Sequence, residues 1–164
     1  TNYQIINWAT WHNLNMWVTD ANNLYNGTPV TGYGCYLNDN TQWWRFQAVG
    51  ATSEIGGKVR TEYVITSTNT TFALNIGYRV AGSNAVMYNR YLDTETWIVE
   101  SGGMSNGFSH IILKSNPSLC LAENPSTHEI YLEPVNYNSP SGYNQLWFIG
   151  NSNQYYSYIN PAAL

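Results

Sequence analysis

Three histidines and two cysteines are the side chains of this chain that could ligate a metal ion or act as nucleophiles. His12, His110 and His128 lie far apart in the sequence and do not form a metal-ligand spacing such as His-Glu-x-x-His. Cys120 and His128 could in principle form a nucleophile and base pair, but a cysteine within a strand is more often structural. We therefore expect a protein that is not an enzyme, with no catalytic residues, no metal site and no cofactor.

Aromatic side chains are the second chemically capable group, and they are unevenly distributed. Five of the 7 tryptophans lie in the first 44 residues. Trp17 is out of phase with Leu14 and Met16, so strand alternation turns it away from the core. On the outer face its ring could stack on a ligand. Trp8 and Trp43 are open to either interpretation, because they could also pack between parts of the fold.

Three tryptophans mark a threefold repeat. They recur at intervals of 53 and 50 residues, and each follows a Gln or Glu by two positions: Gln42 and Trp44, Glu95 and Trp97, Gln145 and Trp147. Upstream of each pair lie a β-rich run, a second run with period-two alternation and a short apolar step. Each unit therefore reads as four short strands that end at a buried tryptophan.

Three such units cannot bury their apolar faces separately, so they should close around one axis. We predict an all-β protein with the β-trefoil fold, in a single domain over residues 1–150. The pseudo-repeats should cover about residues 1–49, 50–100 and 101–150. Residues 151–164 follow the last expected strand, and we expect them to pack on the trefoil or to form a subunit contact, which is compatible with a homodimer.

Composition excludes several partners. Charged residues make up only 10% of the chain, with 6 basic side chains and a net charge of −4. A cationic stripe for a phosphate backbone is therefore missing, and nucleic acid is not an expected partner. No apolar span reaches transmembrane length and no secretory leader is visible, so we expect no membrane insertion. We expect a soluble protein, cytoplasmic or secreted without a visible signal, with the cytoplasm favoured.

Four segments resemble the ricin B-type (R-type) carbohydrate-binding repeat: Asn-Gly-Thr-Pro-Val-Thr-Gly-Tyr-Gly-Cys at 26–35, Thr-Gln-Trp-Trp-Arg-Phe at 41–46, Ser-Leu-Cys-Leu at 118–121 and Asn-Gln-Leu-Trp-Phe at 144–148. The similarity covers roughly residues 3–149, and the weakly charged, Asn-rich style is similar to small fungal lectins of that family. The resemblance implies a non-catalytic lectin, or agglutinin, for glycans of the galactose or N-acetylgalactosamine type.

Site residues follow from the resemblance position by position. In R-type repeats an Asp on the second strand binds sugar hydroxyls, an aromatic on the third strand stacks on the ring, and an Asn or Gln beside the anchor tryptophan completes the site. The implied carbohydrate-binding residues of the first unit are Trp17, Asp20, Tyr33, Asn40 and Gln42, with Trp17 at the Asp position and Asp20 as its substitute. A reserve site in the second unit comprises Asn75, Tyr88 and Asn89. The third unit should be silent, because Ala122 and Glu133 stand at its carboxylate and ring positions.

The cysteines also depart from the family pattern. Many R-type repeats join a second-strand Cys to one that follows the third-strand aromatic. Cys35 would then pair with position 15, which is Asn15, and Cys120 with position 135, which is Val135. We expect two free thiols, which suits a reducing compartment.

A second function class stays open. β-Trefoils also serve as protease inhibitors or other protein-binding modules that present one exposed loop. The Gly-containing connections at residues 50–60 and 101–107 are the candidate loops. The concentration of aromatic rings in the first unit favours the lectin, since an inhibitory loop needs no stacking rings.

Overall fold

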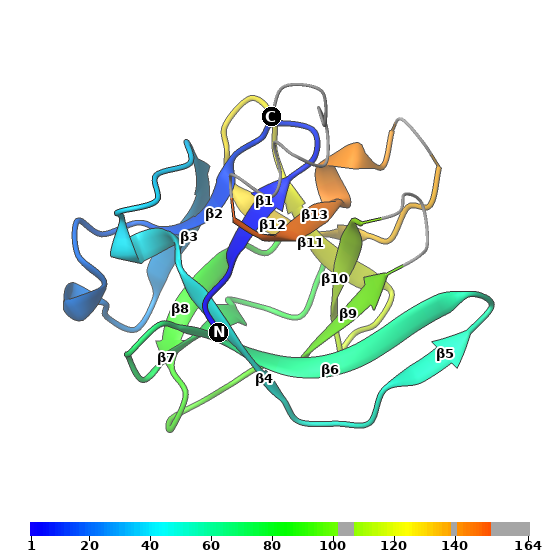
Figure 1. Ribbon diagram of the computed structural model, residues 1–164, viewed down its shortest axis with the longest axis horizontal. Coiled ribbons are helices and arrows are strands. Elements are labelled where there is room, and N and C mark those ends of the chain that lie inside the picture. The colour runs from blue at the N-terminus through cyan, green and yellow to red at the C-terminus, as the bar shows by residue number, and fades with distance from the viewer. Residues whose placement is uncertain (102–106, 139–140, 152–164) are drawn as a thin grey trace.

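The computed structural model describes residues 1–101, 107–138 and 141–151. Within them the chain forms thirteen strands and three short 3-10 turns, with no α-helix (Figure 1). The first unit contains β1 (Gln4–Asn7), β2 (Asn13–Met16), η1 (Ala21–Asn23), β3 (Thr28–Tyr33), η2 (Asn40–Gln42) and β4 (Trp44–Ala48). The second contains β6 (Lys58–Ser67), β7 (Phe72–Ile76), β8 (Ala85–Asn89) and β9 (Trp97–Ser101), preceded by β5 (Ser53–Ile55). The third contains β10 (Ser109–Leu113), β11 (Leu119–Glu123), β12 (Ile130–Pro134), η3 (Tyr143–Gln145) and β13 (Trp147–Gly150).

Six strands close into a barrel. Antiparallel pairing runs from β1 to β13, β10, β9, β6 and β4 in turn, and a bridge between Tyr3 and Trp44 returns β4 to β1. The other strands form the hairpins β2–β3, β7–β8 and β11–β12, which meet around the axis through β3–β8 pairing and isolated bridges. Closure removes the exposed edges that separate units would have. The predicted β-trefoil is confirmed.

The anchor tryptophans hold the three units in the same way. All three are fully buried, and each indole Nε1 donates to a backbone carbonyl at 3.0, 3.0 and 3.1 Å: Trp44 to Leu14, Trp97 to Leu74, Trp147 to Leu121. They fill one apolar core shared by barrel and hairpins. The predicted burial is confirmed, and the three hydrogen bonds identify equivalent positions of the units.

The side chain two positions before each anchor fixes a loop, but by two different means. Each Gln donates from Nε2 to a backbone carbonyl at 2.7 Å: Gln42 to Gly34 and Gln145 to Pro134. Glu95 carries no amide donor and instead accepts from Arg79 Nε at 2.7 Å and from Ser115 Oγ at 3.0 Å. This side chain therefore binds a loop backbone in the first and third units, and an ion pair with a further hydrogen bond replaces that contact in the second.

Two tryptophans that were open to interpretation have structural contacts. Trp8 stacks on Tyr143 with ring centroids 5.0 Å apart and packs against Phe108 at 4.0 Å, so it joins the first unit to the third. Trp43 Nε1 donates to the Leu37 carbonyl at 3.0 Å and so braces the loop before η2.

The connection at residues 50–60 is a hairpin arm rather than an irregular loop. β5 pairs with the first part of β6, with Ile55 opposite Lys58, so Gly56 and Gly57 form a two-residue turn. Their φ values of 60° and 78° are both positive, which is why this turn takes glycine. The arm projects from the barrel in Figure 1. Residues 102–106 of the other candidate loop, and residues 152–164 of the C-terminal segment, lie outside the described residues.

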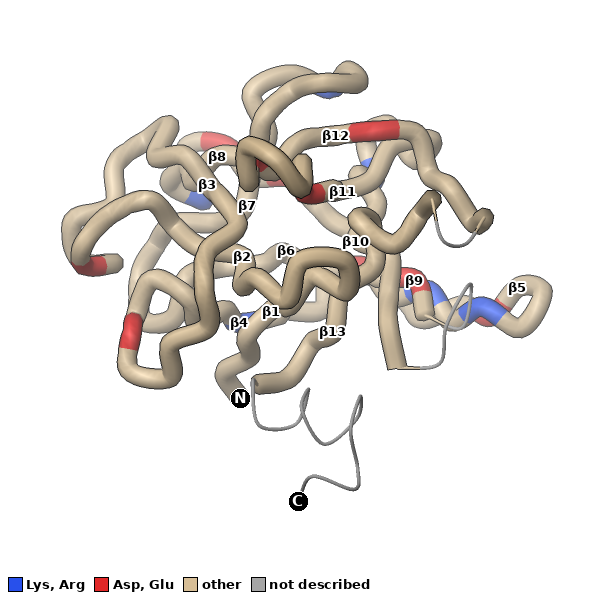
Figure 2. Tube along the Cα trace, turned by 90° about the horizontal axis from the view of Figure 1, so that it is seen from above, with Lys and Arg blue, Asp and Glu red and all other residues tan. Residues whose placement is uncertain are grey.

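Both cysteines are free, as predicted: Cys35 is half-buried and Cys120 is buried. Charges are sparse, and Figure 2 shows few charged positions along the described trace. Over the described part of the chain, no helix has the length and apolar character needed to span a bilayer.

Candidate functional site

A cavity of about 360 Å³ opens on the outer face of the first hairpin. Its lining comes from β2, β3 and the turn η2: Asn15, Trp17, Val18, Thr19, Tyr33, Asp39 and Thr41. The β2–β3 register pairs Asn13 with Tyr33 and Asn15 with Thr31, which turns these four side chains to the same face. Trp17 continues that face beyond the end of β2.

Two aromatic rings form the walls of this cavity. Trp17 is 56% exposed and Tyr33 is 46% exposed, and their centroids lie 6.1 Å apart with planes at 70°. Tyr36 extends the aromatic surface, 6.0 Å from Tyr33. The predicted outward orientation of Trp17 is confirmed. The two rings form a corner that can receive the flat apolar face of a ligand.

Polar groups form the floor between the rings. Asp39 Oδ1 accepts from the Thr41 backbone N–H at 3.0 Å and from Thr41 Oγ1 at 2.6 Å, which caps η2. Thr41 Oγ1 also lies 2.9 Å from Asn15 Oδ1, and since a hydroxyl has one proton it satisfies only one of these acceptors. Among the described residues, the hydrogen bonds to the Asp39 carboxylate fall on Oδ1, which leaves Oδ2 for a ligand hydroxyl.

The predicted residues Asp20 and Asn40 lie beside this cavity. Asp20 Oδ1 accepts from the Asn22 backbone N–H and from Asn40 Nδ2, both at 2.9 Å. These two hydrogen bonds, the backbone bond foremost, lower the pKa of the Asp20 carboxyl. Asp20 and Asn40 line a second cavity of about 490 Å³, which shares Thr19 and Asp39 with the first.

Gln42 lies beneath the site instead of inside it. The side chain is fully buried, and its Oε1 accepts from Asn13 Nδ2 at 2.8 Å and from the Tyr36 backbone N–H at 2.9 Å. Its Nε2 donates a hydrogen bond to the Gly34 backbone carbonyl. A ligand in solvent cannot reach this amide, which positions the segment that carries Tyr36.

Structural equivalence corrects the alignment of the first unit. The residues that follow the indole-accepting carbonyls are equivalent: Asn15, Asn75 and Ala122. Sequence comparison placed Trp17 opposite Asn75 and was therefore wrong by two residues. Cross-strand pairing likewise makes three ring positions equivalent: Tyr33, Tyr88 and Glu133. The same register puts Asn13, and not Asn15, at the position equivalent to Cys120.

In the second unit the predicted residues are only partly brought together. Asn75 and Tyr88 share one face of the β7–β8 hairpin, but Asn75 is buried and its Oδ1 accepts from the Ile76 backbone N–H at 2.7 Å. Asn89 pairs with Phe72 and therefore lies on the opposite face, where its Oδ1 accepts from the Tyr91 backbone N–H.

The third unit has a carboxylate where the first has a ring. Glu133 Oε1 accepts from Gln145 Nε2 at 2.7 Å, and its Oε2 accepts from Tyr131 OH at 2.6 Å. Tyr137 lines the neighbouring cavity of about 640 Å³, but Lys58 Nζ lies 3.5 Å from its ring centroid and occupies one face of the ring.

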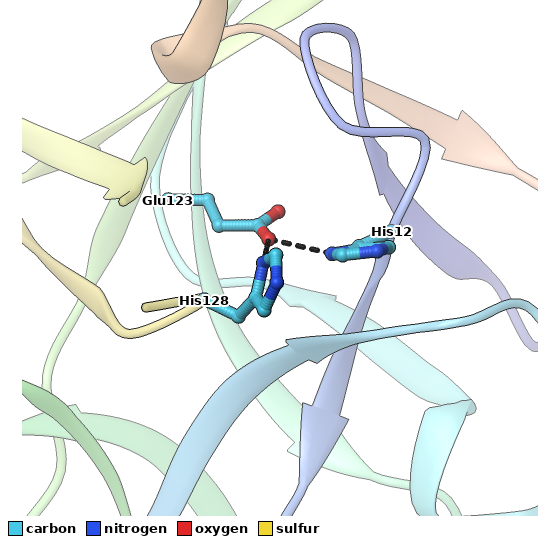
Figure 3. Close-up of side chains that lie close together, drawn as sticks. All are labelled: His12, Glu123 and His128. Atoms are coloured by element: carbon cyan, nitrogen blue, oxygen red, sulfur yellow. Dashed lines mark hydrogen bonds and ion pairs between the residues drawn. The ribbon is translucent and has the colours of Figure 1, made fainter. Parts of the chain in front are cut away.

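Sequence reasoning missed two features. Asp39 was not among the predicted residues, although the order Asp39-Asn40-Thr41 is a capping signal that could have indicated its position. A second group, which shares no residue with the cavity lining, brings His12, Glu123 and His128 together (Figure 3). Glu123 and His128 belong to the β11–β12 hairpin, whereas His12 lies more than a hundred residues away in the first unit, so the sequence gave no signal of a metal-ligating set.

No protein-family model and no curated protein matches the chain. Solved structures do. The Rhizoctonia solani agglutinin is similar with a TM-score of 0.67 at 17% identity, over 92% of this chain and 94% of that one. The C-half of an earthworm R-type lectin, solved in complex with GalNAc, has a TM-score of 0.57 at 16% identity, over 91% of this chain and 97% of that one.

A mosquitocidal holotoxin is also similar, with a TM-score of 0.64 at 20% identity over 93% of this chain, which spans only 17% of the toxin. At these identities the likenesses establish the fold. The chain therefore shares the β-trefoil architecture of R-type lectins, as the repeat and its tryptophans predicted, and its binding properties have to be argued from its own site.

Proposed function

We propose that this protein is a non-catalytic, carbohydrate-binding lectin whose main site is the first-unit cavity. The observation that carries the proposal is the corner of Trp17 and Tyr33 above the polar floor of Asp39 and Thr41. A sugar ring has an apolar C–H face and a rim of hydroxyls, so it needs a flat aromatic surface and fixed acceptors at the same time.

Galactose and N-acetylgalactosamine are the sugars we propose for this cavity. The axial O4 of galactose leaves one face of the ring with a continuous C–H patch, which an aromatic side chain can cover. Asp39 Oδ2 would accept from neighbouring hydroxyls of the same ring, and charge-assisted bonds of this kind are the strong ones. The GalNAc complex of the similar earthworm lectin supports this choice of ligand.

The adjoining cavity extends the site toward a second sugar residue. Because Thr19 and Asp39 belong to both cavities, a disaccharide with its terminal ring against Trp17 would place its next ring over Asp20 and Asn40. In this proposal Asp20 selects the linkage of the glycan, while the sugar type is selected between the rings and Asp39.

The other units contribute less in this proposal. Tyr88 with Asn75 forms the reserve site of the second unit, weakened because Asn75 is buried and Asn89 lies on the other face. The third unit is silent, since the Glu133 carboxylate is held by Tyr131 and Gln145. Dimerisation through the C-terminal segment would multiply the weak single-site affinity by avidity.

A glycan array with the wild-type protein tests the proposal directly. We expect signal concentrated on glycans that end in galactose or N-acetylgalactosamine. Asp39→Asn replaces the available acceptor by a donor and should lower the affinity for the monosaccharide about 10-fold or more. Asp20→Asn should weaken mainly the longer ligands, and Glu54→Gln on the exposed β5 hairpin serves as the matched control. An array without glycan signal would refute the lectin assignment.

A further inference from the structure

Two histidines converge on one buried carboxylate at the contact between the first and third units. His12 directly precedes β2, Glu123 ends β11, and His128 lies in the β11–β12 turn. Glu123 Oε2 lies 2.7 Å from His12 Nδ1 and 3.0 Å from His128 Nδ1. The two imidazole rings stand edge to face, with centroids 4.5 Å apart, and Figure 3 shows both facing the same oxygen.

The fold makes room for this carboxylate and holds it in place. Glu123 is fully buried, and Thr10 Oγ1 donates to its other oxygen, Oε1, at 2.5 Å. A Cβ on Gly32 would lie 2.3 Å from Oε2, so this position of β3 has to be glycine for the carboxylate to fit. Among the described residues its ion-pair partners are the two histidines, and a buried carboxylate needs compensating positive charge.

Backbone conformation on both flanks is unusual. His128 has a φ of 65°, and Trp11, the residue before His12, has a φ of 62°. Left-handed conformations of non-glycine residues are uncommon and costly, and they persist where the surrounding structure requires a particular side-chain position. Here the two conformations help to direct the imidazoles of two separate loops at one oxygen.

We propose that His12, Glu123 and His128 form a binding site for a divalent transition-metal ion, with zinc as the ion of best fit. Two imidazole nitrogens and one carboxylate oxygen are the three-ligand set typical of a zinc ion with an open fourth position. The ligand atoms lie within 4.8 Å of one another. Bond lengths of about 2.0–2.1 Å in tetrahedral geometry separate donor atoms by about 3.3 Å. Both ring nitrogens lie closer than this to Glu123 Oε2, so ion binding requires adjustments of the two rings that bring all three donor atoms to this spacing.

The two histidines are partly exposed to solvent, whereas the carboxylate that they contact is buried. His12 and His128 have side-chain exposures of 27% and 43%, whereas Glu123 has none. An ion can therefore enter between the rings and keep a water ligand. Thr10 orients the carboxylate from behind as a positioning residue. Magnesium and calcium prefer more oxygen ligands than this set offers. The site is separate from the proposed sugar cavity, and its occupation would link the first and third units.

Calorimetric titration of the full chain, freed of metal with a chelator, tests the site with Zn²⁺ as the probe. We expect one ion per chain, a melting temperature that rises with free Zn²⁺, and no response to Mg²⁺. Co²⁺ should give the visible absorption of a four-coordinate complex, which a purely structural cluster would not produce. His12→Gln and His128→Gln should each lower the affinity at least about 10-fold, while Glu129→Gln, an exposed carboxylate beside His128, should not.

Two further variants keep the test decisive if a histidine variant folds poorly. Thr10→Val leaves all three ligands and should weaken Zn²⁺ binding about 10–100-fold. Gly32→Ala inserts a Cβ against the carboxylate and should abolish the Co²⁺ absorption. Absence of stoichiometric Zn²⁺ binding by the wild type, or equal affinity in folded His128→Gln, Thr10→Val and Gly32→Ala proteins, would overturn the proposal.

Discussion

Replacing Tyr33 by alanine removes one wall of the first-unit cavity and should weaken sugar binding without unfolding the protein. The ring is 46% exposed, so of about 200 Å² of tyrosine surface about 90 Å² is available to a ligand. At about 25 cal/mol per Å² complete coverage would contribute about 2.3 kcal/mol, and coverage of half this area about 1.1 kcal/mol. The expected loss of affinity therefore lies between about 6-fold and about 50-fold.

Isothermal titration with N-acetylgalactosamine measures this loss, and circular dichroism checks the fold. Tyr25→Ala is the matched control, since Tyr25 is 55% exposed in the same unit but does not line the cavity. Trp17→Ala should cause a loss at least as large, because Trp17 forms the other wall and is the larger ring. Affinity retained within about twofold by both folded Tyr33→Ala and Trp17→Ala proteins would refute the stacking argument.

Three other predictions concern the fold, the thiols and pH. Trp147→Ala should lower the free energy of unfolding by about 3–5 kcal/mol. Trp147→Phe should lower it by about 1–3 kcal/mol, because it leaves the Leu121 carbonyl without its indole donor. Urea unfolding measures both values. Alkylation without reductant should label both Cys35 and Cys120 in the unfolded chain. In the folded chain labelling should be slow, and for Cys35 the reason is that burial raises its pKa to about 11. A disulfide-linked peptide would contradict this prediction. Burial lowers the pKa of His110 in the folded state, so the unfolded chain binds the proton first, near pH 6.5, and stability falls as the pH drops below that value. His110→Gln should remove this contribution, and equal slopes of stability against pH in the two proteins would count against it.

Strand alternation and the repeated tryptophans predicted the architecture because they reflect local geometry and burial. The register within the first unit was not predictable in the same way. From the indole to its accepting carbonyl the sequence separation is 30, 23 and 26 residues in the three units. The additional residues of the first unit lie in its loops, and the sequence comparison placed Trp17 where Asn15 belongs.

The polar half of the candidate site depends on loop paths that alternation does not determine. Asp39 lines the cavity because its side chain caps η2. Gln42 is buried because its amide forms hydrogen bonds with the backbone of Gly34 and Tyr36. Both residues follow β3 closely in the sequence, and only the three-dimensional path of the loop separates their roles.

The anchor tryptophans and the outward ring positions lie on different faces of the same hairpins, so a unit can keep the fold whatever residue its ring position holds. In the third unit Trp147 and Gln145 retain the hydrogen bonds made by Trp44 and Gln42 in the first. These bonds end on backbone carbonyls, so they form whatever side chain the outward ring position holds, although in the third unit Gln145 Nε2 also donates to Glu133 Oε1. That position can hold Tyr33 in one unit and Glu133 in another at little cost to the core. Loss of the ring therefore removes stacking without removing stability, and the stability of Tyr33→Ala should remain close to that of the wild type.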